Sequence, residues 1–362
     1  KLPISKMSSM YQLFKTDRYP TGIIGDGVEG SVMLYKHLGS HEIMAVKKLK
    51  DPENSGYELP RDKAIEVLRQ AELLNIFPDK QYLVPYTDLI FEEKVCTGEN
   101  SSTATIKYEC YLIMKYFKDG TLKNIIDARK KKMEMFTSAE LARYGLQMSK
   151  GIREIHAKGF MHRDLKPQNI LVDKNGAVLM IADFGRLKLF QEGANFSVAG
   201  THIYCAPEIL GSVRNYNKSV DIFSLGVMLY EMATFHLRVM SFELMNNEKK
   251  TIQEVTKALQ HYNVIKELQT LVVSMVSANP KNRPTIEAVI QQLEAVADKY
   301  SKEIVNIESK FDSLHTITKL EAELESKNKI IAQLEDDIEN ALIKSRLNNS
   351  IVQNQLKLDF QQ

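Results

Sequence analysis

The chain has 362 residues, of which 44% are hydrophobic and 26% are charged, and its formal net charge is +2 at pH 7. This length exceeds one average domain, and the apolar content is ample for a buried core. The small net charge gives no indication of nucleic-acid binding, and no apolar run is long enough to span a membrane. The three cysteines lack metal-ligand spacing and suit a reducing compartment, so we expect a cytoplasmic protein. The chain does not begin with Met, which leaves open whether further domains precede it.

The first predicted elements are two strands joined by a glycine-rich hairpin. An apolar run from Ile23 leads into Gly25, Gly27 and Gly30, and the chain leaves through Val32. Glycines allow backbone N–H groups to approach a phosphate closely. A dinucleotide-binding turn has the same Gly-x-Gly-x-x-Gly spacing, but a helix follows its last glycine. Here the residues that follow are those of a second strand, which favours a phosphate-binding hairpin.

Three further elements are predicted before the middle of the chain. The run Ile43–Lys47 is apolar until its closing lysine and predicts a strand, and a helix is expected over about 61–76. The polar stretch Cys96–Thr105 predicts a long, mobile loop within a hairpin. The apolar run 111–114 then predicts the strand that follows this loop.

The most informative pattern is His162-Arg163-Asp164-Leu165-Lys166-Pro167-Gln168-Asn169, with Asp183-Phe184-Gly185 beginning fourteen positions after its Asn. These motifs place a proton-accepting carboxylate, a phosphate-contacting lysine and two metal-binding side chains within one strand-loop-strand stretch. Phosphoryl transfer needs this set of groups. Isolated triplets occur by chance, so the order and spacing of several motifs carry the argument.

Other segments extend the pattern toward the C-terminus. They are Gly200-Thr201 followed by Ala206-Pro207-Glu208, then Asp221–Gly226, and then Asn279–Pro284. The basic run 129–132 predicts a solvated turn between two helices.

From about Ser301 onward glycine and proline are absent and Glu, Lys, Leu and Ile dominate, which is helix composition. A heptad seam is formed by Ile317, Leu320, Leu324, Ile331, Leu334, Ile338 and Ala341. Only Lys327 interrupts it, so we predict a coiled coil over 301–345 and a frayed tail over 346–362. Whether the helices of the coiled coil run parallel or antiparallel stays open. A single long helix folded back on the rest of the chain also stays an alternative.

Together these motifs resemble the eukaryotic protein kinase family of the Ser/Thr type, over roughly residues 11–297. The resemblance implies an α+β, bilobal fold within a domain at 1–297, followed by the long helix or coiled coil. Its parts would be a β-rich N-lobe at about 11–114, a hinge at 115–117 and a mostly helical C-lobe at 118–297. It also implies ATP and Mg²⁺ as cofactors and a protein as substrate.

The resemblance implies a role for each motif residue. Asp164 would accept the proton of the substrate hydroxyl, and Lys166 would steady the γ-phosphate. Asn169 and Asp183 would hold Mg²⁺ between the phosphates, and Lys47 would contact the α- and β-phosphates. Nucleotide binding is expected from Gly25, Gly27, Gly30, Val32, Ala45, Lys47, Met114, Lys115, Tyr116, Phe117 and Leu171. Within this set, Met114 resembles the gatekeeper, and residues 115–117 resemble the hinge.

The partner of Lys47 is the weakest point of the resemblance. A glutamate on the helix over 61–76 should pair with this lysine, and counting from Lys47 selects Glu66. Counting back from Leu73 and Leu74 instead selects Gln70. We predict Glu66 as the catalytic partner, with the choice between the two positions left open.

Four further residues have expected roles. Arg163 resembles the arginine of kinases whose activation loop is ordered by a phosphate, and Ser197 is the phosphosite candidate. Thr201 is expected to form a hydrogen bond near Asp164. Arg283 is expected to pair with Glu208, which would be a structural contact.

The leading hypothesis is an active Ser/Thr protein kinase that self-associates, or binds a coiled-coil partner, through its tail. A pseudokinase or scaffold is the alternative, since a glutamine at the position of the partner of Lys47 would weaken activity. Small-molecule kinases usually lack the Lys-Pro and Ala-Pro-Glu segments. A kinase-linked nuclease would need a further globular domain after Arg283, where the coiled coil is predicted.

Overall fold

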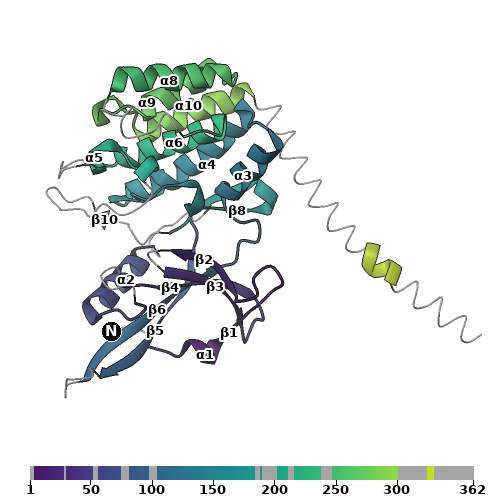
Figure 1. Ribbon diagram of the computed structural model, residues 1–362, viewed down its shortest axis with the longest axis vertical. Helices are drawn as coiled ribbons and strands as arrows, with labels where there is room; N and C mark the ends of the chain where they lie inside the picture. Colours follow the sequence, from purple (N-terminus) through teal and green to yellow (C-terminus); the bar gives the residue numbers. More distant parts are fainter. Residues whose placement is uncertain are drawn as a thin grey trace, which may run out of the picture. The chain divides into compact units, whose positions relative to one another are not determined.

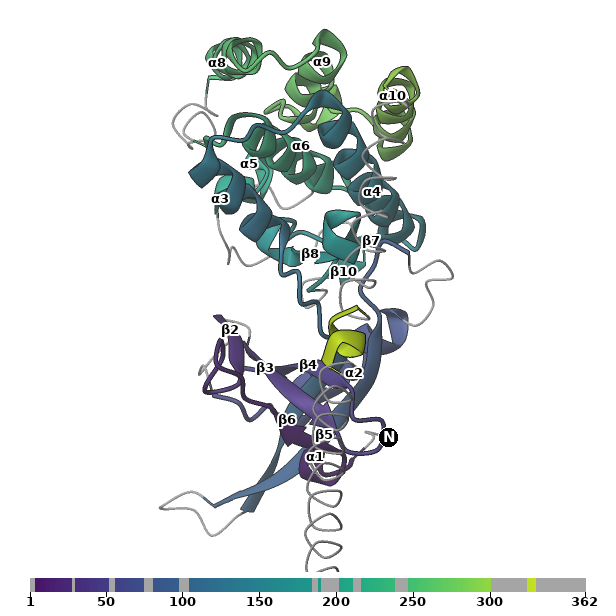
Figure 2. The same cartoon turned by 90° about the vertical axis from the view of Figure 1, so that its right-hand side faces the viewer.

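The structure, a computed structural model, describes residues 4–27, 30–51, 56–74, 81–97, 104–183, 188–189, 202–210, 216–237, 247–300 and 324–329. The chain divides into two units, residues 1–304 and 305–362. The first unit has a β-rich lobe followed by a mostly helical lobe (Figures 1 and 2). The predicted α+β, bilobal arrangement is therefore confirmed.

The N-lobe is built on a six-stranded antiparallel sheet with the order β1-β3-β4-β6-β5, and β2 also pairs with β3. Its elements are α1 (Met7–Met10), β1 (Tyr11–Leu13), β2 (Ile23–Gly27), β3 (Gly30–His37), β4 (Ile43–Leu49), α2 (Arg61–Leu74), β5 (Tyr86–Thr97) and β6 (Ala104–Lys115). The predicted glycine-rich hairpin is the β2–β3 pair. Gly30 has φ of 150°, and a Cβ atom there would collide with the backbone oxygen of Lys48. Only glycine fits this position.

The β5–β6 hairpin is longer than predicted. Cys96 pairs with Thr105, and Thr97 pairs with Ala104, so the two ends of the expected loop are strand residues. That part of the prediction was wrong because threonine and the neighbouring β-branched residues favour strands despite the polarity of the stretch. Residues 98–103 lie outside the described residues.

The C-lobe is mostly helical, with two short β pairs close to the N-lobe. Its helices are α3 (Leu122–Lys132), α4 (Ser138–Ala157), α5 (Pro207–Leu210), α6 (Ser219–Thr234), α8 (Glu248–His261), α9 (Lys266–Met275) and α10 (Ile286–Lys299). Its strands and short 3₁₀ turns are β7 (Phe160–Met161), η1 (Pro167–Asn169), β8 (Ile170–Asp173), η2 (Lys174–Gly176), β9 (Val178–Ile181), β10 (Lys188–Leu189), η4 (His202–Tyr204) and η6 (Pro280–Asn282). Helix α6 is buried over nearly its whole length, as its apolar sequence requires, and it forms the centre of a large hydrophobic core.

The basic run 129–132 is the last turn of α3, so the prediction of a solvated turn was wrong. Cations are favoured at this position because the C-terminal end of a helix carries partial negative charge. Arg129 also pairs with Glu140, with Nη2 2.5 Å from Oε1, and Lys130 Nζ donates to the backbone oxygen of Phe235 at 2.9 Å. Helix composition and local partners explain the run without a ligand.

In the second unit, only residues 324–329 are described, and they are helical. Lys329 Nζ lies 3.1 Å from Glu325 Oε1, one helical turn away. The rest of the predicted coiled coil lies outside the described residues. Among the helices that the structure describes, none is both long and apolar enough to cross a membrane.

Candidate active site

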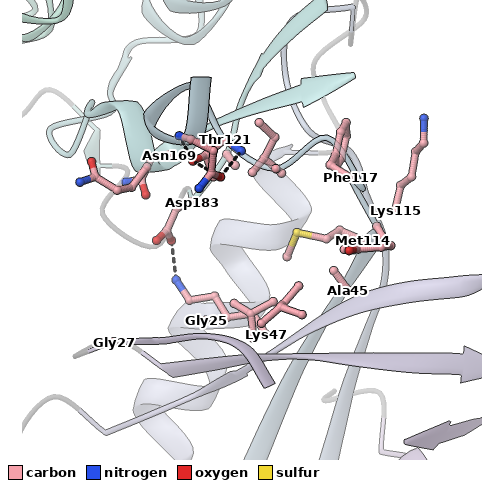
Figure 3. Close-up of a pocket in the computed structure, with 18 of the residues that line it drawn as sticks. Gly25, Gly27, Ala45, Lys47, Met114, Lys115, Phe117, Thr121, Asn169 and Asp183 are labelled. Atoms are coloured by element: carbon pink, nitrogen blue, oxygen red, sulfur yellow. Dashed lines mark hydrogen bonds and ion pairs between the residues drawn. The ribbon is translucent and has the colours of Figure 1, made fainter. Parts of the chain in front are cut away.

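A cavity of about 680 Å³ lies between the glycine-rich hairpin of the N-lobe and the first loops of the C-lobe. Figure 3 shows Ala45 and Lys47 on one side of it and Asn169 and Asp183 on the other. The predicted site residues that line it are Gly25, Gly27, Gly30, Val32, Ala45, Lys47, Met114, Lys115, Tyr116, Phe117, Asp164, Lys166, Asn169, Leu171 and Asp183. The fold thus gathers, around one cavity, residues that the sequence separates by more than a hundred positions.

One end of the cavity is apolar. Ala45, Met114 and Phe117 are buried there in a cluster with Val84 and Ala182. The partly buried side chains of Ile24, Val32 and Leu171 pack against this cluster. A flat aromatic ring would fit between such apolar walls.

The other end carries the charged groups. Asp164 Oδ2 accepts hydrogen bonds from Lys166 Nζ at 2.8 Å and from Asn169 Nδ2 at 3.0 Å. Asn169 Nδ2 also donates to the backbone oxygen of Asp164 at 2.8 Å. The three side chains are therefore held as one hydrogen-bonded group. Asp164 is 9% exposed, so its carboxylate meets solvent mainly through the cavity.

The loop that carries Asp164 is anchored by Asp221 of α6. The carboxylate of Asp221 accepts the backbone N–H groups of His162 and Arg163, both at 2.9 Å, and the Nε2–H of His156 at 2.8 Å. Burial acts to raise the pKa of Asp221, but the hydrogen bond from His156 and the other donors lower it, and the net result lies below the usual value. Arg163 has a positive φ of 65°, a strained conformation for a non-glycine residue. The buried carboxylate holds the backbone in this conformation immediately before Asp164.

Asp183 meets Lys47 across the cavity. Lys47 Nζ lies 2.5 Å from Asp183 Oδ1, and the ammonium-bearing side chain is largely buried (Figure 3). Burial acts to raise the pKa of Asp183, while the nearby positive charge of Lys47 lowers it, and the carboxyl stays below its usual pKa. Asp183 also has a positive φ, of 63°. Each predicted motif thus holds a strained backbone residue: Asp183 lines the cavity, and Arg163 directly precedes Asp164, which lines it.

The residues expected to bind Mg²⁺ fit that ion chemically. Asp183 offers carboxylate oxygens, and the amide of Asn169 is oriented by the two hydrogen bonds that its nitrogen donates, which leaves its oxygen as the ligand atom. Mg²⁺ prefers such oxygen ligands and commonly uses one or two protein groups together with substrate phosphates. Among the described residues no cluster of three His, Cys, Asp or Glu side chains forms a metal site independent of phosphate.

The other predicted residues have different outcomes. Arg283 pairs with Glu208 through two contacts, Nη1–Oε1 at 2.6 Å and Nη2–Oε2 at 2.8 Å, as predicted. Glu66 lies on α2 and is exposed, while the side chain of Gln70 lies outside the described residues, so the partner of Lys47 stays a prediction. Ser197 and Thr201 also lie outside the described residues.

Several lining residues were not predicted. They are Arg18, Tyr19, Ile24, Asp26, Tyr86, Lys118, Gly120, Thr121, Asn124, Gln168 and Ala182. Gln168 and Ala182 lie within or beside the motifs and were within reach of the sequence analysis. Arg18, Tyr19 and Tyr86 carry no local signal, because only the folded sheet brings them to the cavity.

Residues 20–293 match the sequence model of the family described as "Protein kinase domain". The chain belongs to this family. Protein kinases use ATP and Mg²⁺. Serine/threonine-protein kinase 16 of Mus musculus is 29% identical over 75% of this chain and 88% of its own length. Cyclin-dependent kinase B2-1 of Oryza sativa subsp. japonica is 30% identical, over 58% of this chain and 61% of its own length.

Serine/threonine-protein kinase Nek5 of Mus musculus is also 30% identical, over 50% of this chain. The match covers only 29% of that relative's length. The similarity therefore concerns the kinase domain.

Proposed function

We propose that this chain is an ATP-dependent protein kinase that phosphorylates serine or threonine. The observation that carries the proposal is the convergence of Lys47, Asp164, Lys166, Asn169 and Asp183 at the polar end of one cavity whose other end is apolar. The apolar end suits the adenine ring, and the polar end suits the triphosphate and the acceptor hydroxyl. The relatives named as serine/threonine kinases support the same activity.

Phosphoryl transfer depends on positioning and charge stabilisation more than on covalent help from the protein. Asp164 is oriented by Asn169 and Lys166, so its carboxylate can accept the proton of a hydroxyl entering the cavity. Lys166 Nζ lies beside that carboxylate and places a positive charge where the transferring group would pass. Lys47 carries a second positive charge to the opposite wall. Mg²⁺ bound by Asp183 and Asn169 would neutralise phosphate charge.

The preference for serine or threonine over tyrosine rests on Lys166 and Gly200-Thr201. Lys166 bonds directly to Asp164, so it lies where a short aliphatic hydroxyl must approach. Gly200-Thr201 supports the same class by resemblance to the segment that closes a Ser/Thr kinase activation loop.

We also propose that the tail brings two chains together and that this promotes phosphorylation of Ser197. The heptad seam supports self-association, because its apolar side chains contribute stability only when they are buried. Linking two catalytic domains raises their effective concentration to about millimolar. Arg163, whose Nη1 lies 3.2 Å from the Tyr216 hydroxyl, is the candidate phosphate-binding cation. A cytoplasmic location remains part of the proposal.

The test is phosphate transfer from Mg-ATP to a Ser/Thr peptide library by the wild type and by Asp164→Asn. The substitution removes the proton acceptor and keeps the shape of the side chain, so turnover should fall by about 10²–10⁴-fold while nucleotide binding is retained. Equal rates for the two proteins would contradict the assignment of Asp164. Absence of transfer by the wild type would favour the pseudokinase.

A further inference from the structure

The glycine-rich hairpin is tied to the rest of the N-lobe by four polar side chains outside the predicted site: Asp26, Ser31, Lys50 and Tyr57. Asp26 lies between Gly25 and Gly27 near the end of β2 and is a lining residue of the cavity. In the β2–β3 register it stands directly opposite Ser31. We call these four residues the loop clasp.

The clasp is a continuous chain of hydrogen bonds. The hydroxyl of Tyr57 meets Ser31 Oγ, and Ser31 Oγ donates to Asp26 Oδ1 at 2.5 Å. Lys50 Nζ donates to the same Asp26 Oδ1 at 2.8 Å and to the backbone oxygen of Gly27 at 3.0 Å. The ammonium of Lys50 also lies 5.4 Å from the centre of the Tyr57 ring. Each member therefore contacts at least one other member, and three of the hydrogen bonds end on Asp26 or Gly27 of the hairpin.

An isolated surface ion pair contributes little, and the side chain of Asp26 is 60% exposed, but its two partners are shielded. Ser31 is 4% exposed, and the side chain of Lys50 is 16% exposed. The neighbouring ammonium and hydroxyl lower the pKa of Asp26, which keeps the carboxyl ionised and hydrogen-bonded. The clasp thus combines a charge pair with a buried hydroxyl relay.

Both anchors of the clasp are fixed in the N-lobe. Tyr57 lies two residues before Leu59, which is buried and exchanges two backbone hydrogen bonds with Tyr108 of β6, at 2.8 and 2.9 Å. Lys50 follows β4 directly, and its neighbour Asp51 pairs with Lys63 of α2 at 2.7 Å. The hairpin is therefore attached to the central strands and to the region from which α2 begins.

We propose that the loop clasp positions the glycine-rich hairpin for the phosphates of ATP and so sets nucleotide affinity. Two physical effects support this role. A loop already held in place loses less conformational entropy when it closes over a ligand. Lys50 also neutralises the negative charge of Asp26, which would otherwise repel the triphosphate from the cavity wall. The clasp residues act through the loop and are positioning residues.

This inference rests on the proposed function, because it takes ATP to be the ligand of the cavity. It separates phosphate recognition from recognition of the base. Adenosine would occupy only the apolar end, which the clasp does not touch. Loss of the clasp should therefore weaken the binding of Mg-ATP and leave the binding of adenosine unchanged.

The experiment is calorimetric titration of the whole chain with Mg-ATP and, separately, with adenosine. Tyr57→Phe and Ser31→Ala remove one hydroxyl each without changing charge. Each should raise the Kd for Mg-ATP roughly threefold to tenfold, the size expected for one hydrogen bond. The double variant should lose no more affinity for Mg-ATP than the more strongly affected single variant, because both hydroxyls belong to one chain of hydrogen bonds. Lys50→Met should have a larger effect, since it also exposes the charge of Asp26.

Lys299→Met is the matched control, because Lys299 forms an exposed ion pair with Glu267 at 2.6 Å on α9 and α10 and does not line the cavity. It should bind both ligands as the wild type does. In steady-state assays the clasp variants should raise KM for ATP at unchanged kcat. Unchanged Mg-ATP affinity in all three clasp variants, or equal losses for Mg-ATP and adenosine, would overturn the clasp and leave the kinase proposal intact. Failure of the wild type to bind Mg-ATP would overturn both.

Discussion

In the C-lobe the catalytic loop rests on a fully buried carboxylate, Asp221, whereas in the N-lobe the glycine-rich hairpin is held by polar contacts that begin on an exposed Asp26. The core clusters differ in the same way. The C-lobe has one large core around α6, and the N-lobe sheet packs into small, separate clusters. A loop bonded to a buried carboxylate in a large core has less freedom to move than a hairpin held by a few partly exposed polar bonds. From this difference we infer that the C-lobe loop carries the phosphoryl-transfer step and that the N-lobe hairpin sets the affinity for the nucleotide.

After that of Asp164→Asn, the largest predicted effect concerns the charged contact between the lobes. Asp183→Asn should lower turnover by about 10²–10³-fold, because it removes both the partner of Lys47 and a metal-binding carboxylate. Steady-state kinetics over a range of Mg²⁺ concentrations would measure it. If a high Mg²⁺ concentration fully restored the turnover of Asp183→Asn, then Asp183 would act only through its affinity for the metal. An unchanged rate would remove Asp183 from the site.

The second prediction tests the rigidity of the C-lobe anchor. Asp221→Asn should lower the free energy of unfolding by about 3–5 kcal/mol, since it disrupts a buried charge that accepts three hydrogen bonds. Asp127→Asn, which breaks a partly exposed pair with Lys123, should cost less than about 1 kcal/mol. Urea unfolding at pH 7 compares the two variants with the wild type. Equal losses in the free energy of unfolding for Asp221→Asn and Asp127→Asn would show that the catalytic loop does not depend on Asp221.

The stability difference between the wild type and Asp221→Asn should also depend on pH. The folded state lowers the pKa of Asp221, so its ionised form stabilises the native state above the ordinary Asp pKa of about 4. This contribution is lost as the pH falls through the folded-state pKa. The stability difference between the wild type and Asp221→Asn should therefore narrow on acidification. A constant difference down to acid unfolding would contradict the assigned direction of the shift.

The third prediction sharpens the account of the N-lobe, where the partner of Lys47 is still a hypothesis. If Glu66 is the partner, Glu66→Gln should lower turnover by roughly tenfold, the loss expected for a charge-assisted hydrogen bond. Gln70→Ala should then have little effect. The reverse pattern would assign the position to Gln70. Kinetics of both variants under the same conditions separate the two outcomes.

The smallest predicted effect on the isolated catalytic step comes from the tail. Leu324→Asp combined with Ile331→Asp places charges on the heptad seam and should give monomers, with slower autophosphorylation in dilute solution and unchanged turnover once phosphorylated. Glu325→Ala with Lys329→Ala changes an exposed pair off the seam and is the matched control. Light scattering at micromolar concentration measures the association. A monomeric wild type would leave the single folded-back helix as the better hypothesis.

The sequence indicated which C-lobe residues meet at the cavity, because these residues lie close together in the chain. Asp164, Lys166 and Asn169 share one loop, so their juxtaposition follows from local spacing. The pair of Arg283 and Glu208 followed from the resemblance alone. The loop clasp was beyond prediction, because Asp26, Lys50 and Tyr57 meet only after three strands are in register and no motif links them. Helix register likewise decides between Glu66 and Gln70, and spacing alone does not fix it.

The most direct test of the central claim is incubation of the purified chain with Mg-ATP, followed by mass spectrometry of its phosphorylated residues, with Asp164→Asn treated in parallel. The account predicts phosphate on serine or threonine, including Ser197, in the wild type and at least about a hundredfold less in the variant. Phosphate on tyrosine alone would contradict the assigned residue class. Equal labelling of the two proteins would contradict the role assigned to Asp164, and no labelling of either would contradict the proposed kinase activity.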